Sequence, residues 1–321
     1  MHLASDEARI ISGRTPRKRE ASLLNVDHQG LTRYLAADAD RPAPAALASL
    51  TDALKARFGD SLAMILFYGS CLRTGEIADS VVDLHVIIDD YGGYHSPLLA
   101  TLNRLLAPNV FYLATTAGTL ALRCKYNVFS LEHLPKLVAP GRLAVFTWAR
   151  LAQRSAVLYA RDADVLGRVH ALRAQAVRTF AAATASAGGN PRDAESFWRT
   201  ALGLTFGCEL RAESPQRAAQ VVAQDLDYFQ AITAELQLPA PASASFSARA
   251  QWWLRRLVGK CGSLLRLLKG WYTFDGGLDY LVWKLERHSG RHIDVPERVR
   301  RQPILHIWGF AWRLYRDGVF R

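Results

Sequence analysis

Two short apolar runs, each long enough for one β-strand, most constrain the fold of this chain. The first covers residues 63–68 and stops at Gly69-Ser70, and the second covers residues 82–88 and carries Asp83 at its second position. Side chains alternate between the two faces of a strand, so Asp83 and His85 point to one face and the apolar residues between them point to the other. The pattern predicts a carboxylate at the rim of a sheet, one strand away from a Gly-Ser turn.

Such a turn suits a bound phosphate group. Gly69 has no Cβ, so bare backbone N–H groups can come close to an anion. A carboxylate beside it suits the Mg²⁺ that a nucleoside triphosphate carries, because this hard cation takes oxygen ligands and bridges carboxylate to phosphate. The competing interpretation is a buried strand with an incidental aspartate, which a motif this short does not exclude.

The spacing resembles that of the DNA polymerase β-like nucleotidyltransferase superfamily, in which a Gly-Ser turn precedes Asp-x-Asp/Glu on the next strand. Here His85 occupies the position of the second carboxylate. Because Mg²⁺ prefers oxygen ligands to imidazole, we expect His85 to be structural or to contact substrate.

A third apolar run, at residues 120–129, carries charge on one face. Arg123, Lys125 and Asn127 alternate with apolar residues, a pattern that most often marks a solvated edge strand. Beside a phosphate site, the same pattern makes Lys125 a candidate clamp for a triphosphate.

Composition narrows the class of protein and of partner. The formal net charge of +11 on 321 residues indicates an anionic partner such as a nucleotide, a nucleic acid or a phospholipid surface. The four cysteines are far apart, form no CxxC pair and are typical of reduced thiols. No apolar run approaches the roughly 18 residues that cross a bilayer, and residues 1–24 lack the apolar segment of a secretory signal. We therefore expect a cytoplasmic protein.

Further ordered matches narrow the resemblance to the mitochondrial translocator-maintenance family of phosphatidate cytidylyltransferases. They extend over roughly residues 60–230 and comprise Tyr68-Gly69-Ser70, Asp83, Asp89-Asp90, Lys125-Tyr126-x-Val128-x-Ser130, Gly141-Arg142-Leu143 and the segment 203–211. The family implies synthesis of CDP-diacylglycerol from CTP and phosphatidic acid with Mg²⁺. It also implies an α/β nucleotidyltransferase domain, with a small mixed sheet flanked by helices, followed by a winged-helix-like helical domain. The sequence departs from the family at Cys71 and Cys208, which replace glycines, and at Glu209, which replaces aspartate.

The resemblance also assigns roles to individual residues. Asp83, Lys125 and Glu209 form the expected catalytic set. The expected Mg²⁺ ligands are Asp83, Glu209 and Asp89; the nucleotide-binding residues are Tyr68, Gly69, Ser70, Lys125 and Tyr126; and the lipid phosphate is assigned to Arg142 and Arg211.

The predicted organisation has four parts. A flexible basic tail (1–24) precedes the α/β domain (25–186), and the segment Ala187-Gly188-Gly189-Asn190-Pro191 is the clearest linker. A helical domain (191–240) and a helical, basic, Trp-rich region (249–321) follow.

The C-terminal region has an unusual composition. Residues 251–321 hold fourteen Lys/Arg, six Asp/Glu and six of the eight tryptophans, and residues 303–316 place aromatic and aliphatic residues at helical spacing. This composition is typical of a helix at an anionic membrane surface, although a helix packed on its own domain is equally consistent with it. Nucleic-acid binding ranks lower, because no RNA-binding signature is present.

The favoured hypothesis is a peripheral enzyme on the inner face of the membrane that uses CTP, phosphatidic acid and Mg²⁺. Two alternatives stay open. One is a catalytically silent nucleotidyltransferase fold that binds lipid or nucleic acid, and the other is a nucleotidyltransferase acting on another phosphorylated substrate.

Overall fold

The structure is a computed structural model of the whole chain. It describes residues 29–273 except 79, 93–96, 211–214, 239–243 and 245, together with 282, 286, 292–301, 306, 309, 310, 312, 313 and 316. The predicted tail at residues 1–24 and most of the predicted helix at residues 303–316 lie outside these residues.

A five-stranded mixed sheet forms the centre of the α/β part, in the order β3-β4-β2-β1-β5. β2 and β4 run parallel, and the other neighbouring pairs are antiparallel. This confirms the small mixed sheet expected from the sequence. The strands are β1 (Leu62–Tyr68), β2 (Val81–Ile88), β3 (Asn109–Ala117), β4 (Leu120–Ser130) and β5 (Ser155–Ala160).

Both faces of the sheet are covered, which explains why β1 is apolar along its whole length and buried at every position. One face packs against α4 (Ala48–Phe58) through Leu50, Leu54 and Phe58. The other face packs against α7 (Leu134–Val138), α8 (Phe146–Leu151) and the long helix α9 (Ala163–Ser186). The remaining short elements of the α/β part are η1 (Ala45–Leu47), η2 (Gly59–Ser61), α5 (Ser70–Thr74) and α6 (Pro97–Leu105).

A second hydrophobic cluster lies beyond α9. The chain leaves α9 through a tight turn in which Gly188 has φ of 94°. Three helices follow, namely α10 (Ala194–Phe206), α11 (Pro215–Gln224) and α12 (Leu226–Leu236). They share a core with α3 (Gln29–Ala39), α8 and α9, centred on the buried Trp198. The described part of residues 191–240 contains helices and no strand, so the winged-helix likeness and the domain division stay predictions.

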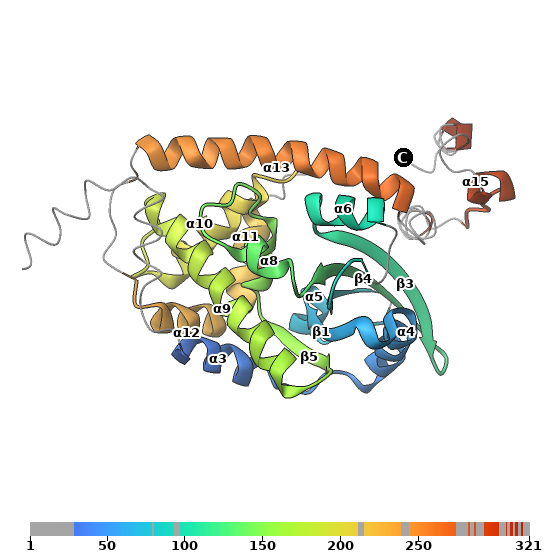
Figure 1. The fold of residues 1–321 in the computed structure, drawn as a ribbon, viewed down its shortest axis with the longest axis horizontal. Helices are drawn as coiled ribbons and strands as arrows, with labels where there is room; N and C mark the ends of the chain where they lie inside the picture. Colours follow the sequence, from blue (N-terminus) through green and yellow to red (C-terminus); the bar gives the residue numbers. More distant parts are fainter. Residues whose placement is uncertain are drawn as a thin grey trace, which may run out of the picture.

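The 28-residue helix α13 (Phe246–Thr273) runs along one side of the molecule, past α10 and α6 (Figure 1). Trp252 donates a hydrogen bond to the carbonyl of Ala183 at 3.3 Å. Near the other end, Lys269 donates to Asn103 Oδ1 at 3.3 Å and to the carbonyl of Leu106 at 3.4 Å. The basic C-terminal region therefore begins as a helix attached to the body, and a short helix, α15 (Glu297–Arg301), lies further on.

Within the described ranges, no helix is both long enough and apolar enough to cross a bilayer.

The contact between α13 and the end of α10 depends on a glycine. A Cβ added at Gly259 would lie 2.4 Å from the carbonyl oxygen of Cys208. A methyl group at Gly262, three residues on, would instead meet only the flexible tip of Arg266 at 3.4 Å.

We therefore expect Gly259→Ala to lower the free energy of unfolding and Gly262→Ala to leave it unchanged or raise it. Overpacking costs about 1–3 kcal/mol, whereas alanine gains about 1 kcal/mol over glycine inside a helix. Urea denaturation of both variants measures the difference. Equal stability of the two variants would contradict this packing of α13.

Candidate active site

Three polar side chains share one rung across the centre of the sheet. Tyr68 of β1 pairs with Asp83 of β2, and Asp83 pairs with Lys125 of β4. Residues directly opposite each other point to the same face of a sheet. Lys125 Nζ lies 3.2 Å from Asp83 Oδ1, and the two side chains are 40% and 23% exposed. The rung is therefore open to a ligand at its charged end.

The turn after β1 closes on the same carboxylate. Gly69 has φ of 88°, a conformation that favours glycine. A Cβ placed there would lie 2.7 Å from Asp83 Oδ2. Both the backbone conformation and the available space therefore require glycine, and Ser70 follows as the first residue of α5. The structure thus brings together the turn and the carboxylate that the sequence pattern singled out.

The protonation states of the rung follow from its surroundings. The Asp83 carboxylate raises the pKa of Lys125, which keeps the ammonium charged. Burial, with a further contribution from Asp83, raises the pKa of Tyr68 to about 12, so its hydroxyl is neutral. That hydroxyl accepts a hydrogen bond from Asn127 Nδ2 at 2.8 Å. The rung therefore combines one anion, one cation and a neutral phenol.

His85 lies one rung deeper and is sealed from solvent. Its ring stacks on Tyr68 with 3.8 Å between centroids, and the residue is 1% exposed. Burial, together with the positive charge of Arg150, lowers the pKa of His85 to about 3. Its Nε2 has no hydrogen-bond partner among the residues that the structure describes. A neutral, buried imidazole is a packing group, as expected for a structural residue.

Arg150 is the functional side chain that the sequence analysis missed. It comes from α8 and donates to Glu209 Oε1 at 2.8 Å and to Oε2 at 3.4 Å. Its guanidinium carbon lies 3.3 Å from the ring centroid of Phe146. Burial opposes its charge, but Glu209, Tyr68 and Asp83 raise its pKa above the ordinary value. The available signal was a lone charge within the otherwise uncharged segment Phe146–Leu151.

Glu209 is therefore near the rung, but as the partner of Arg150. It follows the C-terminal end of α10, and both of its carboxylate oxygens accept hydrogen bonds from that arginine. The structure places it to fix the guanidinium in position.

Two other predicted residues lie away from the rung, which corrects the expectations for them. Tyr126 is fully buried on the opposite face of β4 and stacks on Phe111 with 5.5 Å between centroids, so it cannot contact a nucleotide at the rung. Asp89 follows the far end of β2 and pairs with Arg161 at 2.6 and 3.0 Å. Asp89 lies six positions along the chain from Asp83, a distance of roughly 20 Å in an extended strand, so the two cannot share one metal ion.

Of the two arginines assigned to the lipid phosphate, only Arg142 is described, and among the described residues it forms no hydrogen bond or ion pair with the rung. Arg142 is half-buried, and its carbonyl accepts a hydrogen bond from Arg255 Nε at 3.2 Å. Arg211 lies outside the described residues.

The donor set fits a metal ion delivered with its substrate. Among the described residues there is no group of three or more His, Cys, Asp or Glu side chains that could hold a metal ion. Mg²⁺ in nucleotide sites is commonly bound through one or two carboxylates together with substrate phosphates. Asp83 supplies one such carboxylate at the mouth of the rung.

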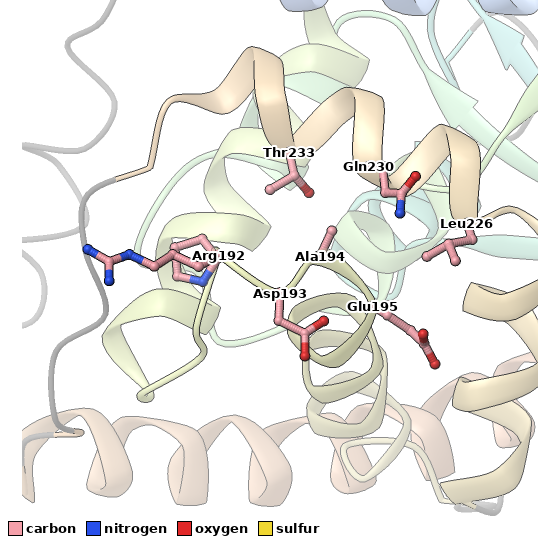
Figure 2. Close-up of a pocket in the computed structure, with 8 residues that line it drawn as sticks. Arg192, Asp193, Ala194, Glu195, Leu226, Gln230 and Thr233 are labelled. Carbon is pink, nitrogen blue, oxygen red and sulfur yellow. The ribbon is translucent and has the colours of Figure 1, made fainter.

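A surface groove of about 460 Å³ lies elsewhere, between the start of α10 and α12 (Figure 2). The side chain of Asp193 lines it and caps α10 by accepting a hydrogen bond from the Ser196 N–H at 3.0 Å. No residue of the rung borders this groove, so the two features are separate.

Comparison with known proteins gives a distant likeness to solved structures. The sequence matches no protein-family model and no curated protein. Among solved structures, a nucleotidyltransferase-like protein from Exiguobacterium sibiricum is 13% identical, with 84% of this chain and 90% of that chain covered. The TM-score of 0.25 is too low to support an argument about fold or function. Membership of the phosphatidate cytidylyltransferase family therefore stays a prediction from the motifs.

The buried state of His85 predicts a dependence of stability on pH. Its ordinary pKa is 6.5, and burial lowers it to about 3. Between these values the unfolded chain binds a proton that the folded chain does not, so stability falls as pH falls through this window, by up to about 1.4 kcal/mol per pH unit. We expect His85→Phe to lose less stability between pH 7 and pH 5 than the unsubstituted protein, as measured by urea denaturation.

His292→Phe is the control: this imidazole is 89% exposed and lies 2.7 Å from Glu286, an exposed pair that contributes little to stability, so the variant should keep nearly the full loss. If His85→Phe loses as much stability as the unsubstituted protein, the imidazole is not buried in its neutral form.

Proposed function

We propose that the protein is a nucleotidyltransferase, and that the rung formed by Asp83 and Lys125 beside Gly69 binds the triphosphate of its nucleotide substrate. The observation that carries the proposal is the approach of the Gly69 backbone to the Asp83 carboxylate, with Lys125 at 3.2 Å on the other side. The backbone of the turn, a carboxylate that can bind a cation and an ammonium that can neutralise negative charge thus lie together at one place, where a phosphate group can bind.

The roles of the residues follow from their charges. Asp83 is the residue that would hold Mg²⁺, which neutralises charge on the triphosphate when it is bound. The turn at Gly69-Ser70 offers backbone N–H groups and a hydroxyl to the phosphates, and Lys125 offsets the charge that develops on pyrophosphate. An oxygen of the acceptor phosphate forms a bond to the α-phosphorus as the bond to pyrophosphate breaks. Because both reactants are anions, alignment and positive charge matter more than a general base.

The narrower proposal is a phosphatidate cytidylyltransferase that makes CDP-diacylglycerol and pyrophosphate from CTP and phosphatidic acid. Its support is the ordered set of motif matches from Tyr68-Gly69-Ser70 to the segment 203–211. Three of these matches, the Gly-Ser turn, Asp83 and Lys125, lie at the rung.

A membrane surface is the proposed partner, on the inner face of the membrane. The helix α13 contains six basic and no acidic residues. Its outward face carries a set of exposed apolar side chains, with Arg256 and Lys260 also exposed: Phe246, Trp253, Leu254, Leu257, Leu264 and Leu265. Exposed apolar side chains beside basic ones suit the interface of an anionic bilayer, where each basic residue contributes about 1 kcal/mol.

The transfer reaction is tested with labelled CTP, Mg²⁺ and vesicles containing phosphatidic acid. We expect lipid-soluble label to form and Asp83→Asn to reduce its rate at least about a hundredfold, since the residue would act on charge in the transition state. Asp52→Asn makes the same charge change on the exposed side of α4 and should keep the full rate.

Labelled product at an unchanged rate in Asp83→Asn would contradict the proposed site. If the protein binds vesicles but none of the four ribonucleoside triphosphates supports turnover, the result would instead favour the alternative of a catalytically silent, lipid-binding fold.

Membrane docking is tested by vesicle sedimentation. We expect the double variant Trp253→Ser, Leu257→Ser to bind phosphatidic-acid vesicles at least about tenfold more weakly, because two apolar side chains no longer leave water. Leu105→Ser removes a side chain of α6 that is 73% exposed and should bind like the unsubstituted protein. Equal loss in both variants would show that α13 is not the docking face.

A further inference from the structure

Two arginines from different helices approach one aromatic ring beside the rung. The guanidinium carbon of Arg150, on α8, lies 3.3 Å from the ring centroid of Phe146, and that of Arg266, on α13, lies 5.2 Å from the same centroid. Guanidinium groups are attracted to the face of an aromatic ring, which holds them without satisfying their hydrogen-bond donors.

The charges of this cluster do not balance. Glu209 is the carboxylate partner of Arg150, with N–O distances of 2.8 and 3.4 Å. Arg266 donates to the hydroxyl of Ser263 at 2.9 Å. In the part of the chain that the structure describes, Arg266 forms no salt bridge, so two cations share one carboxylate.

The three charged side chains of this cluster are partly buried, so water screens the excess positive charge only in part. The side chains of Arg150 and Glu209 are about one-fifth exposed, and Arg266 is half-buried. Burial and the positive charge of the nearby Arg150 lower the pKa of Arg266, and Glu209 offsets this only in part. An anion between the two arginines would relieve that repulsion.

We propose that Arg150 and Arg266, whose guanidinium groups both approach the Phe146 ring, form a second anion subsite that binds the phosphate monoester of the acceptor substrate. The assignment rests on the proposed function, because it is nucleotidyl transfer that requires an acceptor. Two planar forks can bind a phosphate through several charge-assisted hydrogen bonds, and Glu209 is a positioning residue that orients one fork. This subsite takes the role that the sequence analysis gave to Arg142 and Arg211.

The position of the subsite agrees with this role. Arg150 is near enough to the Asp83 carboxylate for that charge to contribute to raising its pKa, so the subsite borders the proposed triphosphate site. The other cation comes from α13, whose outward face carries the exposed apolar side chains described above. A phosphate at this subsite can therefore come from a lipid headgroup or from a soluble ester.

The test measures binding of two phosphate monoesters to the full chain by calorimetry, without nucleotide. The probes are a water-soluble short-chain phosphatidic acid and glycerol 3-phosphate. We expect Arg266→Gln to weaken binding at least about tenfold, the effect of losing a charge-assisted contact to phosphate. Arg266→Lys keeps the positive charge but loses the planar guanidinium with its paired donors, and should bind with intermediate affinity.

Arg199→Gln makes the same change at an exposed position of α10 and should bind as the unsubstituted protein does. Binding of Mg²⁺-CTP should be the same in Arg266→Gln as in the unsubstituted protein, which also shows that the variant is folded. Binding of both probes supports the subsite and shows that it accepts a soluble ester, whereas binding of the lipid probe alone supports the subsite with a lipid headgroup as the source.

Three results would overturn the subsite: no binding of either probe, unchanged binding in Arg266→Gln, or equal loss in Arg199→Gln. Failure of the proposed function gives a different result, in which binding depends on Arg266 but no nucleotidyl product forms.

Discussion

The candidate site depends on the close approach of a backbone to a carboxylate. The Gly69 backbone comes so near Asp83 that no side chain fits between them. β1 must end just before this residue, whose φ lies in the left-handed region, for the turn to face β2. The antiparallel register then sets Tyr68 against Asp83, and the parallel register of β2 with β4 adds Lys125. Gly69, the β1–β2 register and the β2–β4 register thus determine which side chains lie at the open end of the site.

The face of the sheet that carries Asp83 and Lys125 changes from charged to apolar along the strands. At the open end are the charges of Asp83 and Lys125. One rung deeper, His85 and Asn127 are polar but buried and neutral, with 3.4 Å between His85 Nδ1 and Asn127 Nδ2. The following rung holds the apolar pair Ile87 and Phe129. The neutral layer separates the charged opening from the hydrophobic core, which limits the cost of placing ions at the edge of a buried sheet.

The sequence was sufficient for the parts of the site that lie on consecutive strands. The alternation of side chains along residues 82–88 predicted the face of the sheet to which Asp83 points, and the Gly-Ser pair predicted the turn. The same alternation rule places Tyr126 away from Lys125, and strand length separates Asp89 from Asp83, so those two assignments, which came from the family resemblance, could have been rejected from the sequence. Arg150 could not have been found this way, because its position depends on how α8 packs against α9 and on where the end of α10 places Glu209.

The attachment of α13 has a consequence for how the molecule meets any surface. The helix is fixed near its start by Trp252, in its middle by the glycine contact with Cys208, and near its end by Lys269. Arg255 adds a buried guanidinium 4.8 Å from the Trp252 ring and 5.2 Å from the Trp148 ring. Peeling the helix away would break the contacts of Arg255 with both tryptophan rings and with the Arg142 carbonyl, so α13 and the sheet turn together as one body. A surface that contacts the outer side of α13 therefore also sets the orientation of all five strands. It thereby sets the direction that the charged opening beside Asp83 and Lys125 faces.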